Sequence, residues 1–153
     1  MVNATDMPAA WARQFDGTAL ETKLHVAVVL GTVDEAGWPH LAYLSVGEVL
    51  AYGTRTFSFA LWPTSRSTAN LQRTGRGVLH AAADGSIWEA RFVAKPRAST
   101  DEQLIAFDAE VIEVRQHSAP YAEVISLVGF QLTDPSSTLN RWQRQIERLR
   151  SSS

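Results

Sequence analysis

The sequence contains no cysteine. That absence excludes disulfide bonds, thiolate nucleophiles, cysteine-ligated metals and iron–sulfur clusters in one step. An excess of charge is also missing, because 14 Lys and Arg stand against 16 Asp and Glu, giving a formal net charge of −2. Such a chain has no global positive field that would attract nucleic acid or anionic lipid. We therefore predict no nucleic-acid partner, and any anion-binding site must be local.

Long apolar runs are missing too. The opening residues, MVNATDMPAAWARQFDG, lack the basic and apolar regions of a secretory signal, and no apolar run approaches membrane-spanning length. We expect a cytoplasmic protein with no membrane partner.

Several familiar catalytic patterns do not occur. The sequence has no GxSxG, P-loop, GxGxxG or HExxH pattern, so acyl transfer, nucleotide triphosphate hydrolysis, Rossmann-type binding and zinc proteolysis lack support. The four histidines, His25, His40, His80 and His117, show no metal-ligand spacing. We predict no metal site, and only His40, beside Pro39, is a candidate site residue.

What is present is typical of one folded domain. The chain has 153 residues, of which 45% are hydrophobic and 20% charged, and it shows no internal repeat or linker. We expect a single domain over residues 1–153. Within it we expect a helical lead-in over residues 5–23 and a C-terminal helix over residues 137–150, with Leu139, Trp142, Ile146 and Leu149 on one face.

Strand-like segments fill most of the remainder. Apolar alternation, β-branched residues and turn residues predict strands over residues 25–33, 38–46, 48–51, 56–61, 77–83, 86–95 and 121–133. Asp84 and Gly85 predict a two-residue type I′ turn between two of them. Helices are predicted for 65–74, and for 100–117 from the spacing of Leu104, Ile105, Phe107, Val111 and Val114. Mostly hairpin-connected strands indicate a mainly β protein, a small antiparallel β-barrel with peripheral helices.

Two segments in this order resemble the pyridoxamine 5′-phosphate oxidase-like FMN-binding split barrels. VLGTVDEAGWPHLAYLSV is similar to the family's opening hairpin, through Thr32, Asp34, Gly37 and Pro39. TFSFALWPTSRSTANLQRTGRGVL is similar to its strand, SxKxxNL loop and helix, through Ser65, Arg66, Ser67, Asn70 and Leu71. The order of the following hairpin also matches. The resemblance implies a split β-barrel of Greek-key type that forms a homodimer and binds FMN.

It also implies where the cofactor lies. A Ser- and Arg-rich turn entering a helix suits a phosphate dianion, which points to Ser65, Arg66, Ser67, Thr68 and Asn70. The strand before the turn, with Phe59, Ala60, Leu61 and Trp62, would flank the isoalloxazine ring. Trp62 is a better stacking candidate than Trp88, although large aromatic residues in barrel strands are more often core or interface.

The chain departs from the family at two positions. Ser67 stands where family members often have Lys, and residues 40–46 contain no Arg where many have one. Arg55, Arg73, Arg76 and Arg91 are candidates to compensate. Arg91 is preferred because it interrupts the apolar strand EARFVA, although it would also suit an ion pair or a solvent-facing position.

These features leave three hypotheses. The leading one is an FMN-dependent oxidoreductase of the split-barrel class acting on an unassigned small molecule. The second is a non-catalytic split barrel that binds haem, F420 or another small ligand after losing the phosphate clamp. The third is an interaction scaffold with no cofactor.

Overall fold

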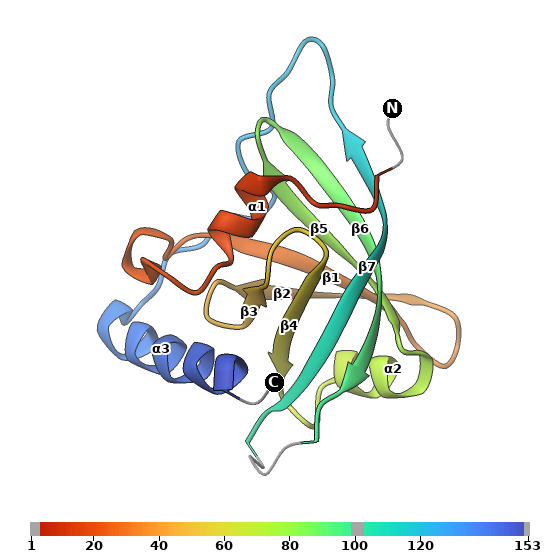
Figure 1. The fold of residues 1–153 in the computed structure, drawn as a ribbon, viewed down its shortest axis with the longest axis vertical. Helices are drawn as coiled ribbons and strands as arrows, with labels where there is room; N and C mark the ends of the chain where they lie inside the picture. The colour runs from red at the N-terminus through yellow and green to blue at the C-terminus, as the bar shows by residue number, and fades with distance from the viewer. Residues whose placement is uncertain (1–3, 99–102, 152–153) are drawn as a thin grey trace.

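Seven antiparallel strands form a single curled sheet in the computed structural model, which describes residues 4–98 and 103–151. The sheet order is β2-β1-β5-β6-β7-β4-β3 (Figure 1). The strands are β1 (Ala27–Val33), β2 (Pro39–Ser45), β3 (Val49–Ala51), β4 (Thr56–Leu61), β5 (Arg76–Ala83), β6 (Ser86–Pro96) and β7 (Ile105–His117). The helices are α1 (Ala9–Gln14), the 3-10 turn η1 (Leu20–Thr22), α2 (Arg66–Thr74) and α3 (Pro135–Ser151). The predicted mainly β, antiparallel class is confirmed.

Local turn chemistry explains the hairpins. The Asp34 carboxylate accepts the N–H groups of Ala36 at 3.0 Å and Trp38 at 2.8 Å, which closes the β1–β2 turn. Asp84 and Gly85 both have positive φ, 51° and 74°, as a type I′ turn requires. The hairpin predicted from this dipeptide is confirmed by the β5–β6 pairing of Ala83 with Ser86.

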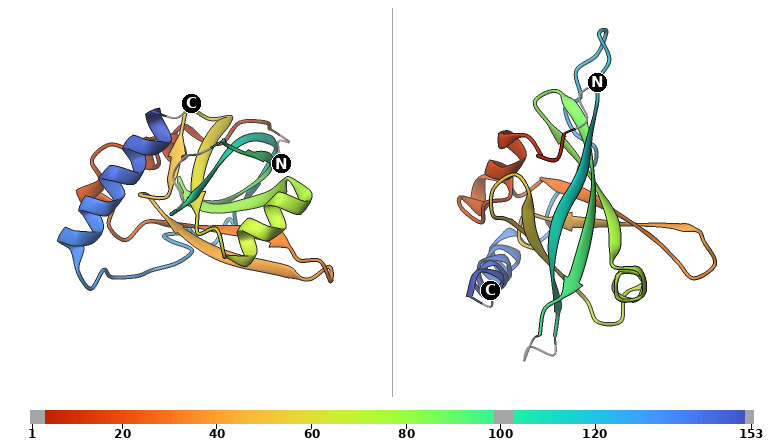
Figure 2. Two further views of the ribbon diagram at one scale, coloured as in Figure 1. Left: turned by 90° about the horizontal axis from the view of Figure 1, so that it is seen from below. Right: turned by 45° about the vertical axis from the view of Figure 1, so that its right-hand side comes forward.

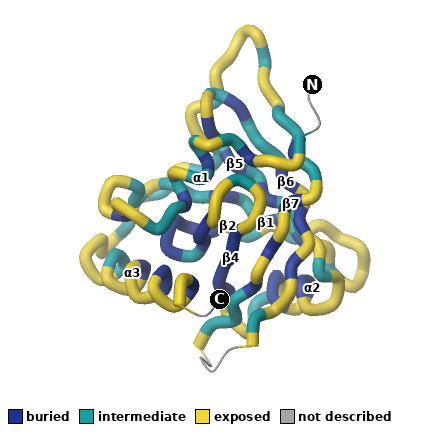
Figure 3. Tube along the Cα trace, viewed as in Figure 1, coloured by how far each residue is buried: buried dark blue, intermediate teal, exposed yellow. Residues whose placement is uncertain are grey.

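An aromatic cluster fills the concave side of the sheet. Phe57 and Phe92 meet edge to face with ring centroids 5.2 Å apart, and Phe59 stacks on Phe107 at 5.3 Å. Trp11 of α1 packs edge-on against Phe57 at 5.8 Å. Buried and exposed positions alternate along much of β6 and β7, whereas β3 and most of β4 are buried throughout (Figure 3). The core therefore lies inside the curl, and α1 joins it.

The two longer helices lie on different sides of the curled sheet (Figure 2). α2 packs on β1, β2 and β6, whereas α3 packs on β3 and β4. The face predicted for the C-terminal helix is buried at Trp142, Ile146 and Leu149, and Leu139 is partly buried against the same core. Among the residues that the structure describes, no helix is long and apolar enough to cross a membrane.

The helix predicted over residues 100–117 is wrong. Residues 105–117 form β7, which pairs with β6 and β4, while residues 100–102 lie outside the described part of the chain. Phe107, Ala109 and Val111 are buried, and Asp108 and Glu110 between them are exposed. That alternation has a period of two. The same apolar positions also fit helical spacing, which made the pattern ambiguous.

The strand predicted over residues 121–133 is also wrong. This segment forms no strand, and its nearest β feature is an isolated bridge between Ala119 and Ala122. β7 already has β6 on one side and β4 on the other, so the chain that leaves it finds no free edge beside it. The segment instead crosses to α3, and the N–H of Val124 donates to the Gly85 carbonyl at 2.8 Å.

Candidate functional site

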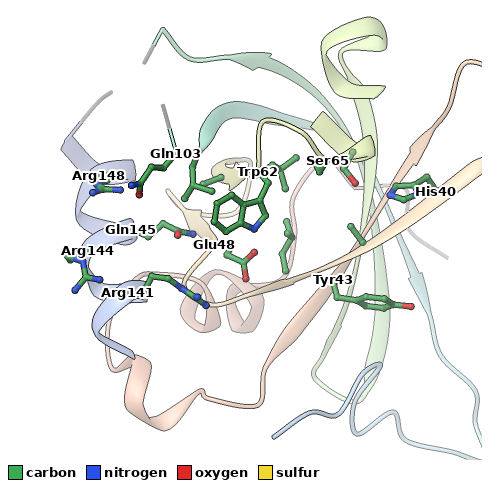
Figure 4. Close-up of a pocket in the computed structure, with 16 residues that line it drawn as sticks. His40, Tyr43, Glu48, Trp62, Ser65, Gln103, Arg141, Arg144, Gln145 and Arg148 are labelled. Carbon is green, nitrogen blue, oxygen red and sulfur yellow. The ribbon is translucent and has the colours of Figure 1, made fainter. Parts of the chain in front are cut away.

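A pocket of about 500 Å³ lies between β2, β4, the start of α2 and α3 (Figure 4). Its walls combine apolar strand residues with polar helix residues. It is lined by His40, Ala42, Tyr43, Leu44, Glu48, Ala60, Leu61, Trp62, Ser65, Ser67, Gln103, Leu104, Arg141, Arg144, Gln145 and Arg148. A volume of this size and a mixed lining are typical of small-molecule sites.

The apolar part of the wall comes from β2 and β4. Ala60 and Leu61 end β4, and the chain then leaves the sheet at Trp62, before Pro63. Pro63 cannot donate to a β-ladder, which explains the exit. Trp62 is 63% exposed, and its ring lies in the middle of the view of the pocket (Figure 4). The ring is therefore available to a flat ligand.

The turn into α2 supplies polar groups at one end of the pocket. The Ser65 hydroxyl caps the helix by accepting the Thr68 N–H at 3.1 Å, and the Thr68 hydroxyl donates to the Trp62 carbonyl at 2.6 Å. Ser67 is only 2% exposed yet lines the pocket. Its hydroxyl has no hydrogen-bond partner within residues 4–98 and 103–151. Of the first-turn N–H groups, which have no intrahelical partners, the one of Thr68 is thus capped by Ser65.

The opposite wall is α3, which is seated on the turn between β2 and β3. Trp142 packs against Gly47 so closely that a Cβ there would lie 2.0 Å from the Trp142 Cγ. Gln145 Nε2 donates to the Gly47 carbonyl at 2.8 Å. These contacts hold α3 so that Arg141 and Arg144 are among the residues that line the pocket, and Arg141 extends toward Glu48 (Figure 4).

Glu48 brings a carboxylate into the pocket. Its Oε1 accepts both the N–H of Ser45 at 3.2 Å and the Ser45 hydroxyl at 2.6 Å. Burial raises the pKa of Glu48, and this effect outweighs the lowering by the Ser45 hydrogen bonds and by the positive charge of Arg141. Glu48 therefore holds a proton more readily than an exposed glutamate.

Five of the ten residues predicted to bind a cofactor line this pocket: Ala60, Leu61, Trp62, Ser65 and Ser67. Three others point into the protein instead. Phe59 is buried in the aromatic core, and Thr68 is buried in the capping network. Asn70 Nδ2 donates to the Thr32 hydroxyl at 3.0 Å and so ties α2 to β1.

The two predicted arginines lie outside the pocket. Arg66 is exposed on α2, and Arg91 forms an ion pair with Glu113 at 3.4 Å on β7, as the alternative interpretation of its position allowed. Arg55 and Arg73 are likewise engaged elsewhere, with Asp6 at 3.7 Å and Glu35 at 3.5 Å. Arg76 is exposed at the start of β5 and does not line the pocket.

Two single-residue predictions have different outcomes. His40 lines the pocket, whereas Trp88 does not, because its indole N–H donates to the Ala83 carbonyl at 2.8 Å. In the described part of the chain, no group of three or more His, Asp or Glu residues is placed to hold a metal ion.

Sequence reasoning missed the charged residues of the pocket, Glu48, Arg141, Arg144 and Arg148. The C-terminal helix that carries the arginines was predicted, but only its apolar face was given a role. Their spacing was visible in the sequence. Nothing in the sequence indicates that the arginine-bearing side of the helix borders the pocket.

A comparison of sequences identifies a relative of nearly the same length. The chain is 33% identical over 138 residues to the uncharacterized protein YclD of Bacillus subtilis, which covers 88% of this chain and 90% of YclD. The chain belongs to the same family as YclD. No protein-family model matches the sequence.

Solved structures show that this YclD relative has the fold of the pyridoxamine 5′-phosphate oxidase-like split barrels. A candidate pyridoxamine 5′-phosphate oxidase from Lactobacillus delbrueckii superimposes with a TM-score of 0.56 at 14% identity, covering 73% of this chain and 95% of that one. A candidate flavin reductase from Shewanella frigidimarina gives 0.52 at 10% identity, covering 71% and 80%. An F420 reductase gives 0.50 at 10% identity, covering 62% and 94%. The expected split-barrel fold is thus confirmed.

Proposed function

We propose that this protein binds FMN in the pocket between β2, β4, α2 and α3 and is a flavin-dependent oxidoreductase acting on a small molecule. The observation that carries the proposal is Ser67, a residue only 2% exposed that lines the pocket at the first turn of α2 and whose side chain makes no hydrogen bond to the described residues. Oriented N–H groups and the helix dipole favour an anion at that position. A terminal phosphate fits this donor set.

The rest of the pocket suits the ring of a flavin. Ala60 and Leu61 offer an apolar surface, and Trp62 presents an exposed indole. An aromatic ring of this kind stacks on a flat ligand and excludes water from one of its faces. When bound, FMN would supply the hydride or electron transfer, while the protein binds, orients and shields it.

A second copy of the chain belongs to the proposal. The β1–β2 hairpin exposes Trp38, Leu41 and Tyr43, whose exposed fractions are 71%, 58% and 60%. Three large exposed apolar side chains on one hairpin favour an interface. Tyr43 also lines the pocket, so a homodimer through this hairpin would enclose the flavin. Sedimentation of the FMN-loaded protein tests for two chains per particle.

Titration with FMN tests the cofactor proposal. We expect one FMN per chain, followed by quenching of flavin fluorescence. Ser67→Ala should lower the affinity for FMN by roughly tenfold or more, because a hydrogen bond to a charged group is lost. It should leave the affinity for riboflavin, which has no phosphate, unchanged. Ser126→Ala, which removes an exposed hydroxyl on the crossing segment, is the control.

Three results would count against the proposal. A wild-type protein that takes up no FMN overturns it. If Ser67→Ala weakens the binding of FMN and of riboflavin equally, the phosphate of FMN does not bind at the start of α2. Tighter saturation by F420 or by haem in parallel titrations assigns the pocket to another cofactor.

A further inference from the structure

The pocket carries positive charge that the flavin proposal does not use. Arg141, Arg144 and Arg148 line its α3 side, against the single carboxylate of Glu48, in a chain whose net charge is −2. Their spacing of three and four residues places them on one side of the helix, where like charges destabilise it. Arg148, close to the helix C-terminus, is favoured there by the helix dipole. Arg141 and Arg144, farther from that end, lack this compensation.

The protein itself neutralises these two arginines only in part. Arg141 is near enough to Glu48 to lower the pKa of that carboxyl, although burial raises it by more. One oxygen of Glu48 is already occupied by the Ser45 N–H and hydroxyl. Arg144 has no hydrogen bond or ion pair with any residue of the described ranges, 4–98 and 103–151. Both guanidinium groups therefore have N–H donors left to bind an anionic ligand at the pocket.

The α3 wall lies at the far end of the pocket from the start of α2. Figure 4 shows Ser65 on one side, Arg141 and Arg144 on the other, and Trp62 with Glu48 between them. If the phosphate of FMN lies at α2 and its ring along Trp62, the arginines lie at the end of the pocket opposite the phosphate. The planar guanidinium fork matches a carboxylate or a phosphate in a bidentate fashion.

We propose that Arg141 and Arg144 bind the anionic group, a carboxylate or a phosphate, of the small molecule that reacts at this pocket. The inference rests on the proposed function and narrows its substrate class to organic anions.

The test uses the FMN-loaded protein and two aromatic anions, benzoate and phenyl phosphate, with benzamide as the uncharged counterpart. Binding is followed by calorimetry and by the change in flavin absorption. Arg141→Gln/Arg144→Gln should weaken at least one of the two anions by roughly tenfold or more and leave benzamide unaffected. The matched control is Arg13→Gln/Arg76→Gln, which removes the same charge from two exposed arginines outside the pocket.

The affinity for FMN shows whether the arginines bind the anion of the substrate or the phosphate of the cofactor. Unchanged FMN affinity in Arg141→Gln/Arg144→Gln, together with weaker anion binding, supports the inference. Loss of FMN affinity with retained riboflavin affinity shows that these arginines hold the cofactor phosphate, which overturns it. The inference is also overturned if the wild-type protein binds neither anion. It is overturned as well if the wild type and the double variant bind both anions with equal affinity.

Calorimetry of the protein without FMN keeps the two proposals distinguishable. If FMN does not bind but benzoate or phenyl phosphate binds in an arginine-dependent way, the flavin proposal fails and the anion site stands. If FMN binds but the arginines are irrelevant to both anions, the reverse holds.

Discussion

The C-terminal end of α3 is fastened to the sheet by Arg97, and removing this side chain should both destabilise the protein and loosen the pocket wall. Its Nη1 donates to the Leu149 carbonyl at 2.8 Å. Nε and Nη2 donate to the Asp108 carboxylate at 3.1 and 2.6 Å, and Nη2 also reaches the Ser58 hydroxyl at 2.9 Å. The Tyr52 hydroxyl donates to the same Leu149 carbonyl at 3.0 Å. One guanidinium thus joins α3 to β4 and β7.

The perturbation is Arg97→Met, which retains an unbranched apolar stem but removes every donor. The Arg97 side chain is 6% exposed, whereas that of Asp108 is 53% exposed. Solvent therefore screens the ion pair, which contributes about 1 kcal/mol or less. The hydrogen bonds to Leu149 and Ser58 add about 1 kcal/mol each. We expect the free energy of unfolding to fall by roughly 2–3 kcal/mol, and Tm by about 4–10 °C for a chain of this length.

The contribution of the Arg97–Asp108 pair to stability should fall at low pH. The hydrogen bond from Arg97 is the largest influence on Asp108 and lowers its pKa below the usual 3.8. A carboxyl whose pKa is lower in the folded state stabilises the protein above its unfolded pKa and loses that contribution as pH falls through the folded value. The difference in stability between wild type and Arg97→Met should therefore shrink below pH 3.8.

Urea unfolding followed by tryptophan fluorescence, at pH 7 and again at pH 3, measures both effects. Arg76→Met is the control, since Arg76 is exposed at the start of β5. A free energy of unfolding at pH 7 equal to that of wild type would refute the reasoning. So would a difference in stability that stays constant down to pH 3, because the ion pair would then contribute nothing.

Two further predictions concern the seat of α3. Gly47→Ala places a Cβ 2.0 Å from the Cγ of the buried Trp142, so helix or turn must shift; we expect a loss of about 1–3 kcal/mol in urea unfolding, and a neutral result would contradict the packing shown. Glu48→Gln should raise stability at neutral pH, because the raised pKa of Glu48 means that ionisation costs folding energy. That gain should vanish in acid as wild-type Glu48 becomes protonated, and a gain independent of pH would exclude this cause.

Local signals in the sequence were enough for the hairpins and for α2. Asp84 and Gly85 specify their turn through φ alone, and Ser65 begins a helix that Gly75 ends with φ of 65°. Each of these choices depends on residues within a few positions of one another. The split-barrel fold followed because the order of such elements is itself restrictive.

β7 could not be decided in the same way. The segment FDAEVIEV offers apolar residues at both helical and strand spacing, and its strand form depends on pairing Phe59 with Phe107 and Val93 with Glu110. Those partners lie far away in the chain. Pairing with β4 and β6 therefore determines that this segment is a strand, and the local sequence of residues 105–117 does not predict it.

The site shows the same division between local and distant causes. Ser65 and Ser67 line the pocket because their own turn places them there, and the sequence predicted them. Arg141 and Arg144 line it because α3 is fixed by Gly47 in its middle and by Arg97 at its end. These contacts join residues that are 98 and 52 positions apart in the sequence.

This dependence has a functional consequence for Arg97, which does not line the pocket. If α3 carries the anion-binding groups, then Arg97→Met should weaken benzoate or phenyl phosphate binding while the α2 end, anchored independently through Asn70 and Thr32, keeps its affinity for FMN. Equal loss of both would mean that the variant disturbs the whole sheet. Selective loss of the anion would show that the two ends of the pocket are held by separate parts of the fold, one built locally and the other assembled by distant contacts.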